Sequence, residues 1–168
     1  LSSFADAIDK AAYALDENGH RHSHQRRIGI EAMRQARERL LNNSTAIGGG
    51  HDCQSLLELL QTVLENVHGV SKLYVYDAAL RIGANLKLSP SKIYLHRGTR
   101  IGAIQLGFDG TRRYLEKTEL PEQLQSLSAA EIEDFLCIYK DHFGVCASTT
   151  NLDCEMPTTT TCANRRPC

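Results

Sequence analysis

The sequence predicts an all-α protein: a compact multi-helix domain over residues 1–143 that contains an αα-hairpin, followed by a disordered tail over residues 144–168. Apolar residues recur at helical spacing in several segments, and glycine or Ser-Pro breaks separate these segments. From residue 144 onward the chain is rich in cysteine and threonine and has no hydrophobic periodicity, which is typical of disorder.

Two helices are expected before the first long break. One spans residues 3–16, with apolar residues at helical spacing and Asn18-Gly19 as its stop. The second spans residues 27–41 and carries arginine and glutamate on its polar face. Three consecutive glycines then predict a loop over residues 42–50.

The αα-hairpin occupies the middle of the chain. Residues 52–67 are apolar almost all round, as expected of a buried helix, and Asp52 is suited to cap it. Gly69 is expected to end that helix in a left-handed C-cap, and a helix over residues 72–87 then completes the hairpin.

The last third is expected to contain two more helices. Residues 93–95 favour a strand but are too short to build a sheet, residues 100–107 form a short helix, and residues 108–120 form a loop. A capping box from Ser128 to Glu131 opens the final helix, which runs to about residue 142. Its expected buried face consists of Ile132, Phe135, Leu136 and Tyr139.

Charge is unevenly distributed. The net charge is −1, yet residues 70–117 hold nine lysines and arginines against three acidic residues. Such a basic block either binds phosphates or pairs with the acidic last helix. Neither a membrane-spanning apolar run nor the features of a signal peptide occur, so we expect a cytoplasmic protein with no membrane partner.

Five of the six cysteines lie in the last 32 residues: Cys137, Cys146, Cys154, Cys162 and Cys168. None of their spacings is a CxxC, so a zinc ribbon or an iron–sulfur cluster is not expected. The simplest interpretation is a set of reduced thiols with no bound cofactor.

The stretch Val67-His68-Gly69-Val70, followed by Ser71-Lys72 and a helix, resembles the helix-hairpin-helix element of DNA-binding proteins over residues 64–88. In that family a hydrophobic-glycine turn presents backbone N–H groups to a DNA phosphate without reading the sequence. Ser71 stands where the family usually has a second glycine. The resemblance implies that Gly69, Val70, Ser71 and Lys72 bind phosphate; the alternative is a plain helical corner.

Glycosylases that contain this hairpin carry their catalytic aspartate well beyond it. Asp77 lies only eight residues after Gly69, inside the following helix, so we do not expect glycosylase activity.

Further basic and hydroxyl side chains gather near a second predicted helix start: Arg97, Thr99 and Arg100. Anions are favoured at helix N-termini, so these residues, with Lys72, Arg81 and Lys92, would complete a phosphate-binding face. The alternative is that Arg97 and Arg100 pair with acidic residues of the last helix: Glu131, Glu133 or Asp134.

Three histidines alternate along a polar segment: His20, His22 and His24. Alternate imidazoles can bind Zn²⁺, with His51 or Asp52 as a further ligand and Asp52 or Glu58 as the base of a hydrolase. The alternative is a solvated connector.

The function expected from the sequence is nucleic-acid or phosphate-ligand binding through residues 69–100, without sequence readout. Two alternatives stay open: a zinc-dependent hydrolase built on the histidine segment, and a protein-interaction scaffold with no catalytic activity. The sequence does not decide whether the protein is an enzyme.

Overall fold

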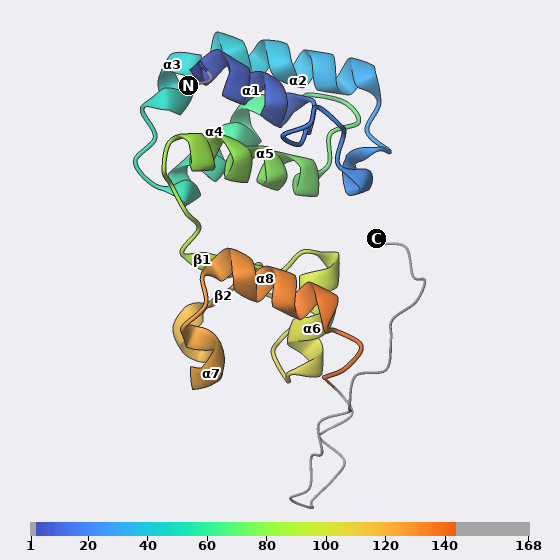
Figure 1. Cartoon of the computed structure of the whole chain (residues 1–168), viewed down its shortest axis with the longest axis vertical. Coiled ribbons are helices and arrows are strands. Elements are labelled where there is room, and N and C mark those ends of the chain that lie inside the picture. The colour runs from blue at the N-terminus through green and yellow to red at the C-terminus, as the bar shows by residue number, and fades with distance from the viewer. Residues whose placement is uncertain (1–2, 144–168) are drawn as a thin grey trace, which may run out of the picture. The chain divides into compact units, whose positions relative to one another are not determined.

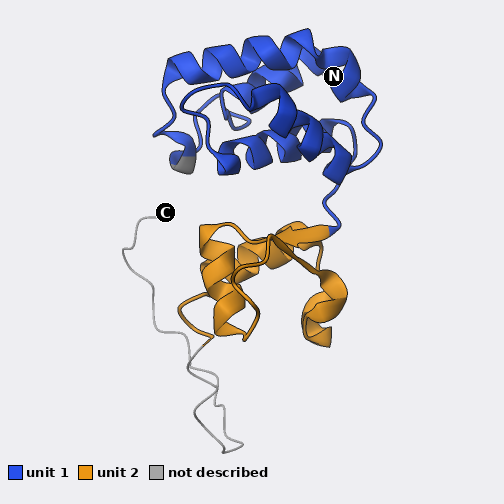
Figure 2. Cartoon of the chain, turned by 180° about the vertical axis from the view of Figure 1, so that it is seen from behind, with its two compact units in different colours: residues 1–91 blue, residues 92–168 orange. Residues whose placement is uncertain are grey.

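The computed structural model describes residues 3–143, and helices are the main secondary structure of this part of the chain (Figure 1). The all-α prediction is confirmed. The chain divides into two compact units, Leu1–Ser91 and Lys92–Cys168 (Figure 2). A boundary therefore falls inside the region 1–143 that the sequence analysis treats as one domain, directly after the Ser89-Pro90 break. The predicted tail lies outside the described residues.

The first unit is a bundle of five helices with one short 3₁₀ turn, η1 (Ser23–Gln25). These helices are α1 (Phe4–Ala12), α2 (Ile30–Asn42), α3 (Ser44–Gly48), α4 (Cys53–Leu64) and α5 (Lys72–Asn85). Helix α1 packs against α2 and α5, and α4 packs against α2 and α5. Their shared core includes Ile8, Met33, Leu40, Leu56, Leu60, Tyr74 and Ile82, all almost fully buried.

Side-chain hydrogen bonds cap the starts of three of these helices, α1, α4 and α5. Ser3, Asp52 and Ser71 each accept a hydrogen bond from the backbone N–H three residues later, which satisfies one donor of the first helical turn. The prediction that Asp52 caps α4 is thereby confirmed.

Several predicted boundaries in this unit are wrong; α2, for example, starts at Ile30 rather than at residue 27. Helix α1 ends at Ala12 rather than residue 16, because Ala14 adopts a positive φ of 51° and Leu15 N–H donates back to the carbonyl of Lys10 at 2.9 Å, which closes the helix end. The predicted loop 42–50 contains α3, because its glycines come only at the end of that short helix. Helix α4 ends at Leu64, so Gly69 is not its C-cap.

In its described part, residues 92–143, the second unit combines a small sheet with three helices. It contains β1 (Lys92–Tyr94), α6 (Arg97–Gln105), β2 (Tyr114–Glu116), the 3₁₀ turn η2 (Lys117–Glu119), α7 (Glu122–Gln125) and α8 (Ala129–Ile138). Strands β1 and β2 pair antiparallel, with Ile93 opposite Leu115. Both of these side chains are fully buried and join Leu95, Ile132 and Leu136 in the core.

The sheet corrects the prediction that residues 93–95 are too short to pair. The partner strand lies inside the predicted loop 108–120, so neither segment is long enough to be recognised alone. Ile93 and Leu115 are buried on the same face of the sheet, and this burial stabilises the pairing of two strands that are individually short.

Helices α6 and α8 pack against each other at two glycines of α6. A Cβ atom at Gly98 would overlap Sγ of Cys137, and one at Gly102 would overlap the carbonyl oxygen of Leu136. Helix α6 starts three residues before the predicted 100–107. The Ser128 capping box of α8 is confirmed, but α8 ends at Ile138.

The predicted buried face of α8 is partly wrong. Ile132 and Leu136 are fully buried, whereas Tyr139 is 48% exposed and Glu133 is 9% exposed. Glu133 can be buried because its Oε1 accepts the backbone N–H of Tyr94 at 2.7 Å.

Among the helices of residues 3–143, none combines the length and apolar character that a membrane crossing requires.

Candidate functional site

The turn between α4 and α5 has a compact geometry with an exposed edge. Gly69 has a φ of +88°, a conformation that favours glycine, and Val70 N–H donates to the carbonyl of Val67 at 3.3 Å. His68, Gly69, Ser71 and Lys72 are exposed, while Val70 is half-buried. The chain therefore turns tightly here and presents its polar edge to solvent.

The first turn of α5 follows directly. Ser71 is the N-cap residue, and its hydroxyl accepts the N–H of Tyr74 at 3.1 Å. No carbonyl of the helix can reach the N–H groups of Lys72 and Leu73, because these residues occupy its first two positions. The first turn contains no acidic residue, so the positive end of a 14-residue helix stands beside the Lys72 ammonium.

Two residues near this turn, Ser71 and Tyr74, have clear structural roles. Ser71 has a φ of −92°, which any residue adopts, so the backbone at this position does not require glycine. Tyr74 is buried and donates its hydroxyl to the carbonyl of Ala12 at 2.6 Å. Burial raises the pKa of Tyr74, so its phenol stays protonated. Tyr74 therefore anchors α5 onto α1.

The second predicted group, Arg97, Thr99 and Arg100, belongs to the other unit. Thr99 is 5% exposed. Arg100 donates to the carbonyl of Leu95 at 2.5 Å, to that of Arg112 at 2.9 Å, and also to that of Gly110. Only Arg97, the first residue of α6, carries an exposed side chain. Thr99 is thus a packing residue, and Arg100 holds the loop between α6 and β2.

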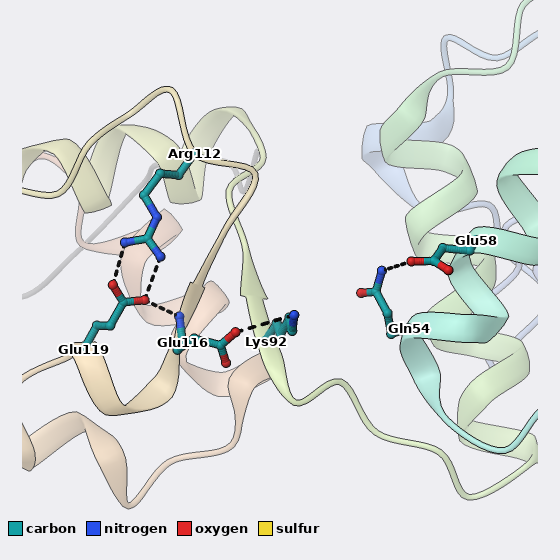
Figure 3. A network of polar contacts seen from close by, with 6 residues as sticks. All are labelled: Gln54, Glu58, Lys92, Arg112, Glu116 and Glu119. Atoms are coloured by element: carbon teal, nitrogen blue, oxygen red, sulfur yellow. Dashed lines mark hydrogen bonds and ion pairs between the residues drawn. The ribbon is translucent and has the colours of Figure 1, made fainter.

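Two other cations of the basic block, Lys92 and Arg112, form ion pairs within the second unit (Figure 3). Nζ of Lys92 lies 3.5 Å from Glu116 and 4.0 Å from the ring centroid of Tyr114, and a hydrogen bond to Tyr114 raises the pKa of Lys92. Arg112 forms two hydrogen bonds to Glu119, at 2.6 and 2.7 Å. The partners of these two cations thus come from the segment around β2 rather than from α8.

Arg81 is likewise partly withdrawn from solvent. Burial lowers the pKa of Arg81, and the charge of Asp77, one turn earlier on α5, partly offsets this effect. Asp77 accepts a hydrogen bond from the buried side chain of Gln25, which ties the segment after α1 to α5. Arg81 is therefore a half-buried residue of the first unit and not part of the exposed turn.

The described side chains of the histidine segment do not belong to any cluster of potential metal ligands. His20 is exposed, with Nδ1 3.9 Å from Asp16, and His22 precedes η1; the side chain of His24 lies outside the description. Asp52 caps α4, and Glu58 accepts a hydrogen bond from Gln54 at 2.5 Å (Figure 3). Among the residues described with side chains, no three potential ligands gather around one point.

Two features escaped the sequence analysis. Leu73, an apolar residue in the first turn of α5, is 37% exposed next to Lys72. Gly98 and Gly102 were not recognised as a packing motif, although their four-residue spacing, which places small residues on one helix face, is a usable signal.

The chain matches no protein-family model, no curated protein and no solved structure.

Proposed function

We propose that this protein binds the phosphate backbone of nucleic acid, without sequence readout, through the turn Gly69-Val70-Ser71-Lys72. The observation that carries the proposal is the exposed start of α5. It combines a glycine turn, backbone N–H groups at a helix N-terminus, no acidic residue in the first turn, and Lys72. These are the groups that stabilise a bound phosphate oxygen.

In this proposal each residue has a distinct role. Gly69 allows the chain to turn, the hydroxyl of Ser71 orders the first helical turn, and Lys72 supplies charge. The backbone N–H groups of Lys72 and Leu73 are the donors nearest the phosphate. Contacts of this kind position a protein on the backbone and carry no base information, so binding is expected to be independent of sequence.

The proposal rests on the first unit alone. Thr99 and Arg100 are occupied in packing and in hydrogen bonds to carbonyls, so they do not contribute direct contacts. A single turn of this kind neutralises few phosphates, and the resulting affinity is expected to be modest and sensitive to salt.

The test is fluorescence anisotropy of a labelled duplex titrated with the full chain at several salt concentrations. The expected result is log K falling linearly with log[salt], with a slope of about −0.9 for each phosphate neutralised. Lys72→Glu should weaken binding by about tenfold and make the slope shallower by about one phosphate.

The matched control is Lys87→Glu, which makes the same charge change at an exposed residue just beyond the opposite end of α5. It should bind like the unmodified chain. Equal losses in both variants would indicate only the effect of net charge, and an absence of binding at low salt would contradict the proposal altogether.

A further inference from the structure

The outer face of α6 exposes apolar side chains next to a positive charge. Arg97, Ile101 and Ile104 share this face because they are spaced by four and three residues. All three side chains are exposed, and Ile104 is 50% exposed. Nothing in the described part of the chain forms an ion pair with Arg97.

The outer face of α8 has the opposite charge and the same apolar character. Glu131, Asp134 and Ile138 share this face at spacings of three and four residues, and Ile138 is 65% exposed. Within residues 3–143, Asp134 has no ion-pair partner either. With Ile101 and Ile104, Ile138 makes three exposed isoleucines in this unit, and exposed apolar groups that form one patch rimmed by polar residues mark a contact surface.

The two faces adjoin at the crossing of the helices. Cys137 is exposed, and its Sγ lies against Gly98, one helical turn before Ile101 and Gly102. Ile138 follows Cys137 directly. Arg97 directly precedes Gly98 in the same way, so Arg97 and Ile138 are each next in the chain to a residue of this contact, within the same compact unit.

The spacings on the two faces match. Arg97 precedes Ile101 by four residues and Ile104 by seven. On α8, Asp134 precedes Ile138 by four residues, and Glu131 precedes it by seven. When α6 of one molecule lies parallel to α8 of another, Arg97 lies beside Glu131 or Asp134. In the same arrangement Ile101 or Ile104 lies beside Ile138.

We propose that this face, Arg97, Ile101 and Ile104 with Asp134 and Ile138, binds the same face of a second copy of the chain. A two-fold axis pairs α6 of each molecule with α8 of the other, so each contact occurs twice in the dimer. Each molecule therefore contributes both halves of the complementary surface. Nucleic acid is a poorer occupant, because the exposed carboxylates of Glu131 and Asp134 repel phosphate.

The first experiment is sedimentation equilibrium of the full chain with a reducing agent present, so that exposed Cys137 and the other cysteines do not cross-link. A dimer is expected at concentrations up to roughly 200 μM, where a micromolar Kd populates it. A monomer throughout this range would overturn the proposal and leave the face to a different protein.

Ile138→Glu should weaken the dimer by at least about tenfold, because it places a carboxylate in the apolar part of the interface. Ile30→Glu is the matched control, since Ile30 is a 61% exposed isoleucine in the first unit. It should leave the dimer intact. A dimer of unchanged affinity in Ile138→Glu would overturn the proposal.

A charge exchange tests the pairing itself. Arg97→Glu and Asp134→Arg should each weaken the dimer, because each places like charges against one another. The double variant restores opposite charges and should recover most of the lost affinity. Additive losses in the double variant would overturn the pairing, and circular dichroism of all variants shows whether they fold.

Discussion

Gly102 of α6 lies directly against the backbone carbonyl of Leu136 in α8, leaving no room for a side chain between the two helices. Gly98, one turn earlier, lies in the same way against Cys137. The close approach buries Ile132, Leu136 and Ala103 around it. The packing of the second unit thus depends on glycine at position 102.

Gly102→Ala should destabilise the second unit by about 2 kcal/mol. The overlap is with backbone, which cannot rotate away, so overpacking costs roughly 3 kcal/mol and outweighs the roughly 1 kcal/mol that alanine gains in helix propensity. Hydrogen exchange of α6 and α8 should report the loss. In Gly48→Ala the new Cβ would lie 3.5 Å from the ring of Phe4, an ordinary contact, so this control should cause no loss.

Arg100→Lys should lower the free energy of unfolding of the second unit by roughly 1–3 kcal/mol. Lysine keeps the charge but cannot reach the three carbonyls that the guanidinium contacts, those of Leu95, Gly110 and Arg112. Urea denaturation measures the change. Arg97→Lys, at an exposed residue, should be neutral, and equal effects of the two changes would contradict a structural role for Arg100.

Ser71→Asp separates the fold of α5 from its proposed ligand. Aspartate is as good an N-cap as serine and its charge suits the positive helix end, so stability should be kept or slightly raised. The same carboxylate stands where the proposed phosphate binds, so duplex affinity should fall by about tenfold or more. Anisotropy and thermal melting of one preparation compare the two effects.

The control for this change is Ser3→Asp, at the N-cap of α1. It alters net charge equally and should leave duplex affinity as it is. Undiminished binding in Ser71→Asp would show that phosphate is not held at the start of α5.

The stability of the second unit should fall in acid. Hydrogen bonds from Arg112, with a further one from the backbone N–H of Glu116, lower the pKa of Glu119 from 4.5 to about 2. Because the folded pKa is the lower one, the stabilisation is fully present above pH 4.5 and is lost as the pH falls towards 2. Glu119→Gln should make this decline shallower in urea titrations at several pH values. An unchanged decline would show that the pair does not contribute.

The candidate turn could be predicted because its chemistry is local. Ser71, Lys72 and Gly69 lie within four residues, and a capping hydroxyl, a cation and a glycine are recognisable without knowledge of the rest of the chain. The second basic group could not be predicted. Arg97 and Arg100 look alike in the sequence, and only the position of the carbonyls around Arg100 separates a structural guanidinium from an exposed one.

The sequence by itself determined the all-α class and the starts of the capped helices, because Ser3, Asp52, Ser71 and Ser128 act on N–H groups three residues away. Only the tertiary structure decided the pairing of β1 with β2, the contact of α6 with α8 and the boundary at Ser91. Each of these joins or separates segments that are distant in the chain, and their stability comes from burying surfaces that neither segment defines alone.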